Sequence, residues 1–190
     1  TKVDIRFVSS WAGICYHHGV DDVVCSPMFV ADSMTYTARI QLADAAVKGD
    51  YDYVFWMDSD MVVPRDALKK LLASDKEMVT GLYFQRRGDH APVIYSKVDE
   101  KERIVCEDYP KDKLFQIAAC GFGCVLMKTD VIRIVARSSG GLTFQPYNGI
   151  GEDLSFCYRW GEACGEIWCN PTIKCGHVGD YVFTEEDWHG

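Results

Sequence analysis

The chain opens with a short apolar run that predicts a strand. Residues 3–10 (VDIRFVSS) are rich in β-branched and apolar residues, as strands usually are. Residues 11–30 mix Gly, Cys, His and Asp and predict a loop, in which residues 22–25 could add a short strand. The first helix is therefore expected only after residue 30.

Helical spacing starts near residue 32. Asp32 or Ser33 is the expected N-cap, because a short polar side chain can accept a hydrogen bond from the first free N–H groups. Gly49 is the expected end, since glycine tolerates the backbone conformation that closes a helix. The apolar side chains that fall on one face are Met34, Ala38, Leu42, Ala45 and Ala46.

Strands and helices continue to alternate over the rest of the chain. Residues 51–57 (YDYVFWM) are short, aromatic and bounded by polar residues, which predicts a buried strand. Pro64 then opens a helix with Leu68, Leu71 and Leu72 turned inward. In chain order, the next elements expected are a strand over 77–84, an exposed charged hairpin over 95–109, and two strands around a glycine turn over 115–127. A short helix from Thr129 through Ala136 and a glycine-rich loop over 138–151 should follow. The last elements expected are a helix from Glu152 ended by Gly165, and a strand and turn over 166–178.

This alternation predicts an α/β fold with a mostly parallel central sheet, built as a single domain over residues 1–190. A length of 190 residues supplies one hydrophobic core but not two. Hydrophobic residues make up 48% of the chain and charged residues 25%, which excludes a disordered, collagen-like or coiled-coil protein. Ligands of such sheets bind at the carboxyl ends of the strands, so the chemistry is expected there.

Net charge narrows the class of partner. Lys and Arg total 20 against 28 Asp and Glu, a formal charge of −8. No nucleic-acid partner is therefore expected, whereas a small anion held through a bound metal is compatible, because the metal inverts the local charge. The longest nearly uncharged stretch, residues 114–127, is shorter than the roughly 20 residues of a spanning helix, so no transmembrane segment is expected.

Cysteine usage indicates a reducing environment. The nine cysteines are an odd number, contain no CxxC pair and match no common zinc module in their spacing. Free, largely buried thiols and a cytoplasmic location are therefore expected. The first residues show no secretory signal pattern.

The sharpest chemical feature is Asp58-Ser59-Asp60, directly after the apolar strand. Two carboxylates two residues apart project to the same side of an extended segment. Hard divalent cations prefer carboxylate oxygens and keep open positions for water or phosphate. The same residues could also form a solvated turn, since Asp is common after strands.

Two further motifs follow downstream. Glu152 and Asp153 come after a Gly-Ile-Gly loop and would lie in the first turn of a helix, where the helix dipole favours ionised acids. Plain helix capping explains this pair equally well. His177 lies between glycines, which suggests an exposed turn, and its imidazole could complete a site begun by two aspartates. A lone histidine is nevertheless more often structural.

Together these motifs resemble the glycosyltransferases of the GT-A fold, in particular the family-2 type. WMDSDMVVP resembles their DxD segment, and GEDLSFCYRWGEACGEIWCNP followed by GHVG resembles their acidic-pair helix, glycine turn and terminal histidine. ACGFGCVLMKTDV is similar to the small-residue strand before that helix, and the helix with Thr37-Ala38-Arg39 is similar to the one before DxD. The likeness covers residues 31–179. The family usually has about two strand–helix units before DxD, whereas only 57 residues precede Asp58 here, so the contacts to the nucleotide base lack a counterpart.

The resemblance implies transfer of a sugar from a UDP- or GDP-type nucleotide-sugar donor to a hydroxyl of a glycan or another acceptor, with inversion at the anomeric carbon. Mn²⁺ or Mg²⁺, held by Asp58, Asp60 and His177, would stabilise the leaving nucleotide diphosphate.

The resemblance also assigns roles to the remaining polar residues. Asp153 is the expected general base, and Glu152 would position the acceptor. Arg39, Arg86 and Ser10, together with Asp58, are the expected contacts to the donor.

Two other function classes stay open from the sequence. Nucleotidyl transfer in sugar-nucleotide synthesis uses a related sheet, but it usually needs a Gly-rich loop with Lys or Arg after the first strand, and SSWAGICYHHG has no such cation. A non-catalytic, metal-stabilised carbohydrate-binding module is the third class, which would release no nucleotide.

Overall fold

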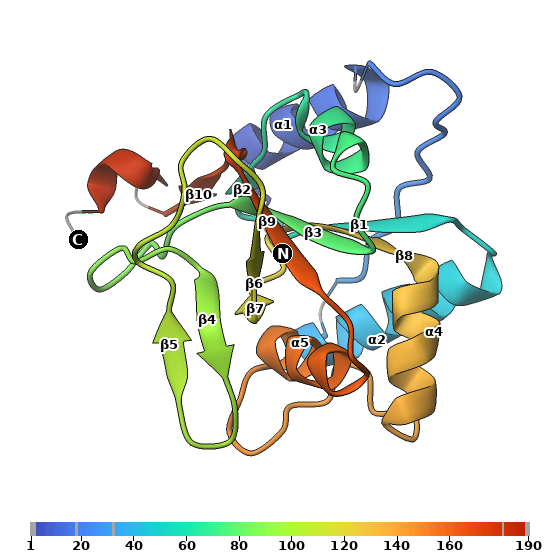
Figure 1. The fold of residues 1–190 in the computed structure, drawn as a ribbon. Helices are drawn as coiled ribbons and strands as arrows, with labels where there is room; N and C mark the ends of the chain where they lie inside the picture. The colour runs from blue at the N-terminus through green and yellow to red at the C-terminus, as the bar shows by residue number, and fades with distance from the viewer. Residues whose placement is uncertain (1–2, 18, 32, 180, 189–190) are drawn as a thin grey trace.

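A five-stranded mixed sheet forms the centre of the fold (Figure 1). The computed structural model describes residues 3–17, 19–31, 33–179 and 181–188. From one edge of the sheet to the other, the strands are β1 (Tyr53–Met57), β8 (Cys124–Lys128), β3 (Met78–Leu82), β9 (Ile167–Lys174) and β6 (Phe115–Ile117).

The strands of this sheet are mostly antiparallel. β3 and β9 run parallel, while the other three neighbouring pairs of this described sheet run antiparallel. The α/β class is confirmed, but the prediction of a mostly parallel sheet is wrong. The reason is β8, which inserts between β1 and β3 and pairs antiparallel with both. Strands that follow one another along the chain are therefore not parallel neighbours.

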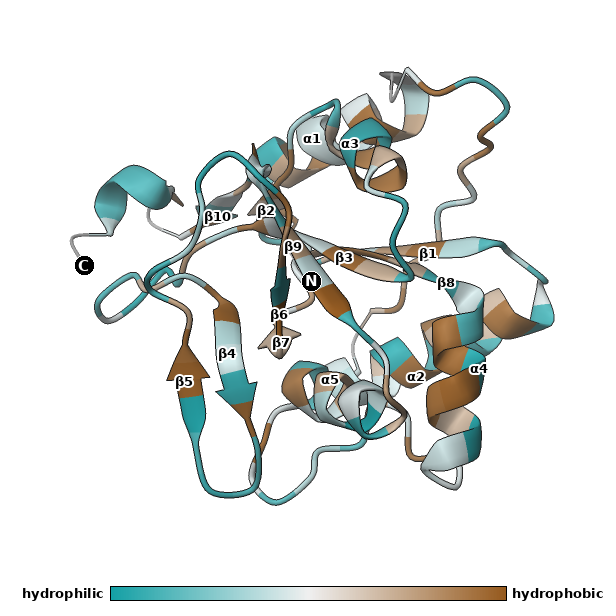
Figure 2. Cartoon of the chain, viewed as in Figure 1, coloured by the Kyte–Doolittle hydropathy of each residue, from teal (hydrophilic) through white to brown (hydrophobic). Residues whose placement is uncertain are grey.

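Helices cover both faces of the sheet (Figure 1). α1 (Ile5–His17) and α3 (Ala67–Ala73) lie on one side, and α2 (Thr35–Lys48), α4 (Thr129–Ser138) and α5 (Glu152–Glu162) on the other. Each side has its own hydrophobic cluster, and the neighbours Met78 and Val79 of β3 belong to different clusters because successive strand residues point to opposite faces. The hydrophobic colour of Figure 2 accordingly concentrates in these layers, and the tip of the hairpin between β4 and β5 is hydrophilic.

The predicted strand over residues 3–10 is wrong, because residues 5–10 form the first part of α1. Their buried side chains follow helical spacing: Phe7, Ser10 and Ile14 face the sheet. Asp4 caps the helix, since its carboxylate accepts a hydrogen bond from the N–H of Arg6 at 2.8 Å. α1 also occupies residues 11–17 of the predicted loop, and residues 22–25 form no strand.

Ser10 fastens α1 to the segment that follows the DxD motif. Its hydroxyl donates to the carbonyl oxygen of Val63 at 2.8 Å and accepts from the N–H of Val63 at 2.7 Å. Both groups are buried, so each needs a partner inside the protein.

α2 begins at Thr35, with Met34 at the N-cap position, so Ser33 is not the cap; Asp32 lies outside the described residues. Gly49 is confirmed as the residue that closes the helix. Of the predicted inner face, Ala46 is confirmed as buried and Leu42 packs against the core, whereas Met34 and Ala45 are exposed. The other buried residues of the helix are Arg39 and Ala43. The guanidinium of Arg39 points into the protein, where it pairs with acids that are described in the next subsection.

The other predicted elements are largely confirmed, with shifted ends. α3 starts at Ala67 rather than at Pro64 and buries Leu68 and Leu71. α4 extends to Ser138, with Lys128 rather than Thr129 at its N-cap position. The charged hairpin is present as β4 (Ile94–Val98) and β5 (Arg103–Val105), and β4 also pairs with β7 (Ala119–Cys120).

α5 ends at Glu162, before the predicted Gly165. A Cβ at position 165 would lie 1.9 Å from the ring of Trp160, so only glycine allows this ring to pack there. No disulfide links the nine cysteines. Within the described residues, no helix is long and apolar enough to cross a membrane.

A small sheet completes the fold and positions the candidate site. β10 (Gly176–Val178) pairs antiparallel with β2 (Met61–Val62) and with β11 (Val182–Phe183), which leads to the short 3₁₀ helix η1 (Glu185–Asp187). This pairing sets His177 opposite Met61, directly after the DxD motif.

We predict that Ser10→Ala destabilises the protein by about 2–3 kcal/mol, because it leaves the buried N–H and carbonyl groups of Val63 without partners. Urea unfolding followed by tryptophan fluorescence measures this change. The matched control is Ser9→Ala, which removes an exposed hydroxyl from the same helix and should leave stability within about 0.5 kcal/mol. Equal stability of the two variants would contradict the described docking of α1.

Candidate active site at the end of the β1 strand

The turn after β1 presents Asp58 and Asp60 beside β10. The N–H of Met61 donates to the carbonyl oxygen of Asp58 at 3.1 Å, and the N–H of Val178 donates to that of Asp60 at 2.7 Å. These backbone bonds fix the turn, so the two carboxylates are held in place while their side chains stay partly exposed, at 40% and 32%.

Asp60, His177 and Arg86 form the first of two charge clusters. The Oδ2 atom of Asp60 accepts from Nη1 of Arg86 at 2.7 Å and lies 3.4 Å from Nε2 of His177. Burial favours the neutral form of Asp60, but His177 and Arg86 outweigh it and lower the pKa of this carboxyl below its usual value. Burial lowers the pKa of His177, yet the hydrogen bonds to Asp60 and to the Phe84 carbonyl outweigh it and leave that pKa raised.

The other ring nitrogen of His177 determines its orientation. Nδ1–H donates to the carbonyl oxygen of Phe84 at 2.8 Å, which directs Nε2 toward Asp60. A backbone carbonyl on Nδ1 is the support that metal-ligating histidines commonly have.

Asp60 and His177 fit a divalent cation as two neighbouring ligands. Ligand atoms about 2.1 Å from one ion and at right angles to each other lie about 3 Å apart, close to the 3.4 Å between Oδ2 and Nε2. Arginines engage both aspartates, Asp58 through Oδ1 with Arg39 and Asp60 through Oδ2 with Arg86, so a cation held by Asp60 and His177 would have to share Oδ2 with Arg86 or displace it. Among the described residues, no group of three acidic, histidine or cysteine side chains is assembled to hold a metal ion.

Arg39 is the centre of the second charge cluster. Its side chain is 7% exposed; Nη2 donates to Asp58 at 2.9 Å and Nε donates to Glu152 at 3.4 Å. The guanidinium also lies over the rings of Trp56 and Phe122, 5.7 and 5.1 Å from their centroids. Arg39 therefore links the end of β1 to the first turn of α5.

Asp153 lies partly buried next to Glu152 in the first turn of α5. Burial raises the pKa of Asp153 to about 6, and the negative charge of Glu152 adds to this effect. The N–H of Leu154, which donates to Oδ1 at 2.7 Å, and the positive charge of Arg39 oppose the rise. A carboxyl with a pKa near 6 is suited to accept a proton at neutral pH.

Tyr83 belongs to the site and was not predicted from the sequence. Its hydroxyl accepts a hydrogen bond from the N–H of Gly123 at 3.4 Å, and its ring packs edge-on against His177. Burial, together with the charges of Asp58 and Asp153, raises the pKa of Tyr83 well above its usual value. A Cβ at Gly121 would lie 2.0 Å from this hydroxyl, so the glycines of GFG make room for the tyrosine. Tyr83 precedes Gly121 by 38 positions and Gly123 by 40. No sequence pattern connects residues so far apart, so nothing in the sequence indicated Tyr83.

The structure thus gathers most of the predicted site residues around one turn. Asp58, Arg39 and Glu152 are in contact, as are Asp60, Arg86 and His177. Ser10 stands apart, because its hydroxyl is engaged with Val63 in the contact between α1 and β2.

The comparisons with known proteins concern the fold. No protein-family model and no curated protein sequence matches this chain. Among solved structures, A197 from STIV aligns with a TM-score of 0.63 and 17% identity, over 98% of this chain and 86% of that one. GalNAc-T7, crystallised with UDP, GalNAc and Mn²⁺, aligns with a TM-score of 0.51 and 15% identity, over 78% of this chain and 31% of that one. The fold is therefore similar to that of A197 and to part of the fold of GalNAc-T7.

We predict that Asp153→Asn stabilises the protein at pH 7.5 by on the order of 2 kcal/mol. A raised pKa means that the folded state binds the proton more tightly than the unfolded state. The stability this provides is complete below pH 3.8 and is lost as the pH rises through about 6, so the ionised carboxylate destabilises the fold at neutral pH. The amide keeps an acceptor for the N–H of Leu154 but carries no charge.

Chemical unfolding at pH 7.5 and at pH 3.5 measures this effect, and the gain should vanish at the lower pH. The exposed Asp44→Asn on α2 is the control and should leave stability within about 0.5 kcal/mol of the unchanged protein. A destabilised Asp153→Asn protein at pH 7.5 would show that the carboxylate is stabilised, not penalised, by its surroundings.

Proposed function

We propose that this protein is a glycosyltransferase that moves a sugar from a UDP- or GDP-type nucleotide-sugar donor to an acceptor hydroxyl. The observation that carries the proposal is the convergence of four acids and a histidine, from three parts of the chain, on the turn after β1. Asp58 and Asp60 come from that turn, Glu152 and Asp153 from the start of α5, and His177 from β10. The likeness of the fold to part of GalNAc-T7 supports the same class.

Asp60 and His177 are the proposed ligands of Mn²⁺ or Mg²⁺, with Asp58 as a further ligand or donor contact. When bound, such an ion supplies Lewis-acid stabilisation of the charge on the departing diphosphate. Arg86, which already contacts Asp60, is placed to pair with a phosphate oxygen next to this position. An acidic protein needs such cations, because its own charge would otherwise repel the donor.

Asp153 is the proposed general base and Glu152 the residue that orients the acceptor. The raised pKa of Asp153 lets its carboxylate take the proton of the acceptor hydroxyl at neutral pH. Glu152 is held by Arg39 and is therefore fixed in direction. Attack by an acceptor activated in this way, opposite the leaving diphosphate, gives inversion at the anomeric carbon.

The first test concerns the cation. His177→Ala should weaken Mn²⁺ binding about ten- to a hundredfold, and Asp60→Ala should abolish it together with cation-dependent donor binding. Isothermal titration with Mn²⁺, and then with UDP- and GDP-sugars, measures both affinities. His90→Ala is a matched control, since His90 also bonds a backbone carbonyl, that of Gln85, at 2.9 Å. Tight donor binding in excess EDTA would contradict the proposed role of the ion.

The second test concerns turnover. Asp153→Asn should lower sugar transfer about 100- to 10,000-fold while donor binding persists. Nucleotide release from a panel of nucleotide sugars, and the anomeric configuration of the product by NMR, are the measurements. Pyrophosphate release from a nucleoside triphosphate and a sugar phosphate would instead indicate nucleotidyl transfer. Sugar binding without release of any nucleotide would indicate a binding module.

A further inference from the structure

Arg86 and His177 share one carboxylate oxygen of Asp60. Nη1 of Arg86 donates to Oδ2 at 2.7 Å, and the same oxygen lies 3.4 Å from Nε2 of His177. A guanidinium does not lose its proton in a protein, so Arg86 is a permanent cation at this position. The oxygen that a divalent cation would need is therefore already neutralised by a side chain.

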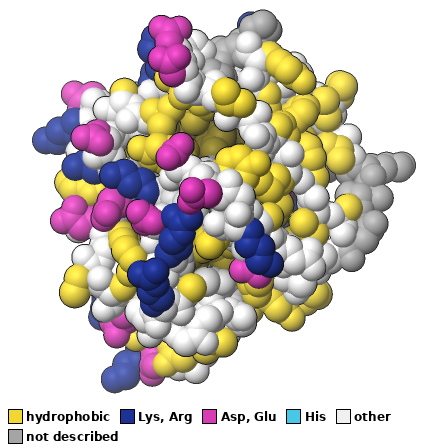
Figure 3. All heavy atoms as spheres, turned by 90° about the vertical axis from the view of Figure 1, so that its right-hand side faces the viewer, with side chains coloured by type: hydrophobic (Ala, Val, Ile, Leu, Met, Phe, Trp, Pro, Cys, Tyr) yellow, Lys and Arg dark blue, Asp and Glu magenta, His cyan; other side chains and the backbone are white. Residues whose placement is uncertain are grey.

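This ion pair differs in solvation from others of the protein. Figure 3 shows basic side chains beside acidic ones on one face of the molecule, and Arg133 pairs with Asp50 and Asp130, whose side chains are 94% and 73% exposed. Such exposed pairs contribute little free energy, because water replaces either partner easily. Asp60 is only 32% exposed, so losing the cation on its carboxylate without a replacement costs more.

The guanidinium of Arg86 also has unused donors. Within the described part of the chain, both of its hydrogen bonds start from Nη1, the second going to the carbonyl oxygen of Val178 at 3.2 Å. Its Nε and Nη2 groups are thus available to another acceptor, and the side chain is 41% exposed. These groups form the planar fork that binds a phosphate through two parallel hydrogen bonds.

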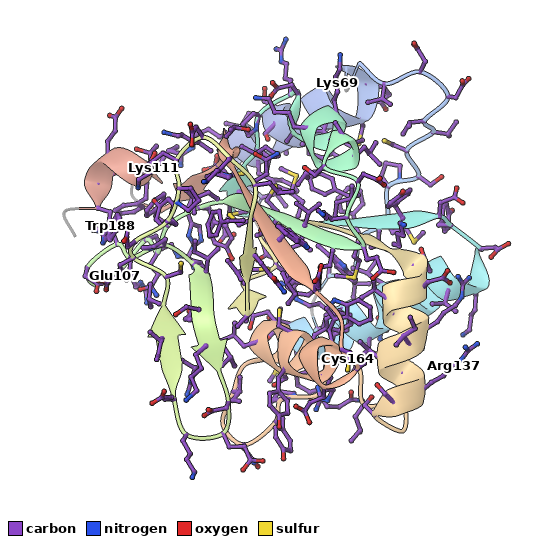
Figure 4. The ribbon with its side chains drawn as sticks, in the orientation of Figure 1. Lys69, Glu107, Lys111, Arg137, Cys164 and Trp188 are labelled. Carbon is purple, nitrogen blue, oxygen red and sulfur yellow. The ribbon has the colours of Figure 1, made fainter. Side chains whose placement is uncertain are left out.

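The backbone that carries Arg86 is anchored at its base. Phe84 is buried, its carbonyl oxygen accepts from His177, and its ring lies 6.1 Å from that of Trp188. Figure 4 shows Trp188 and Lys111 at the C-terminal end of the molecule, where Nζ of Lys111 lies 5.5 Å from the centroid of the Trp188 ring. Because this base is packed, Arg86 can change its partner by rotating its exposed side chain alone.

A divalent cation and Arg86 compete for Oδ2 of Asp60. An ion about 2.1 Å from this oxygen would bring a second positive charge to the atom that Arg86 contacts at 2.7 Å. Like charges this close repel each other, and the repulsion is stronger where water is partly excluded. The guanidinium is the partner that can leave, since it is exposed and its other donors are free.

We propose that Arg86 is an exchangeable counter-cation of Asp60: it occupies Oδ2 in the absence of ligands, leaves this oxygen when a divalent cation binds, and then pairs with the diphosphate of the donor. The inference rests on the proposed function, in which this site takes a cation and a nucleotide diphosphate. It adds a regulation of the site by one of its own side chains.

Arg86 couples the two ligands through this exchange. Without a nucleotide, the ion binds at the expense of the contact between Arg86 and Asp60. With a nucleotide present, the guanidinium exchanges a carboxylate for a phosphate and keeps an anionic partner. Each ligand therefore strengthens the binding of the other, by the same factor in both directions.

Isothermal titration of the full chain with Mn²⁺ alone, and then with UDP and GDP at saturating Mn²⁺, tests the proposal. Arg86→Ala should bind Mn²⁺ about three- to tenfold more tightly than the unchanged protein, because Oδ2 is then free. The same variant should bind the nucleotide at least about tenfold more weakly, because it lacks the fork that holds the phosphate. A role confined to local structure would weaken both affinities together.

The coupling itself is a second readout. The factor by which the nucleotide strengthens Mn²⁺ binding should be at least about tenfold smaller in Arg86→Ala than in the unchanged protein. Arg86→Gln should behave in the same way, because it removes the charge and keeps most of the side-chain length.

The matched control is Arg87→Ala, which removes the same charge from the neighbouring exposed residue. Arg87 has no ion-pair partner among the residues that the structure describes, so both affinities should stay within about twofold of those of the unchanged protein. Equal effects of Arg86→Ala and Arg87→Ala would overturn the proposal, since net charge alone would then explain them.

The remaining outcomes separate this inference from the proposed function. Unchanged or weaker Mn²⁺ binding by Arg86→Ala would overturn the inference and leave Asp60 and His177 as ligands. Mn²⁺ binding by Arg86→Ala but not by the unchanged protein would support it, whereas binding by neither would overturn both the inference and the role of the ion. The titrations need no turnover, so a failure of sugar transfer alone would count against the proposed function only.

Discussion

The buried guanidinium of Arg39 is the interaction on which the site depends. Asp58, Glu152 and Asp153 bring three acids together around the buried side chain of Arg39, which faces them from α2. Burial disfavours the charge of Arg39, but the surrounding acids outweigh this effect and keep its pKa raised. The aromatic rings of Trp56 and Phe122 hold the guanidinium from the sides. Without this cation the end of β1 and the start of α5 would carry uncompensated like charges, which is costly in a low-dielectric interior.

Much of this arrangement could be predicted from the sequence, because it depends on local patterns. The apolar run before Asp58 has a clear strand composition, and the acids after Gly151 mark a helix start, so their elements are right. The inward turn of Arg39 could not be predicted, since an arginine on a helix usually faces solvent. Its burial depends on acids from Asp58 and Glu152, which lie 19 and 113 residues away in the chain.

At the start of the chain, by contrast, the local pattern predicted the wrong element. Val3, Ile5 and Phe7 alternate with polar residues, a pattern that fits a strand with one buried side. The same residues also contain the helical series Phe7, Ser10 and Ile14, and this series is the one that packs. Ser10 favours the helix over the strand, because in the helix its hydroxyl bonds both the N–H and the carbonyl oxygen of Val63. The two residues are 53 positions apart, so no local pattern reveals this contact. Val3 and Ile5, which a strand would bury together with Phe7, are consequently left exposed.

The parallel pairing of β3 with β9 has a consequence for how the protein folds. Val79 lies opposite Trp168, and β8, the other neighbour of β3, also comes from much later in the chain than β3. The centre of the sheet therefore cannot assemble until most of the polypeptide is present, and closing such long loops costs entropy before any contact repays it. Folding should accordingly be slow for a chain of this size. β3, which is buried along its whole length in the folded protein, would remain unpaired on the ribosome until β8 and then β9 have emerged.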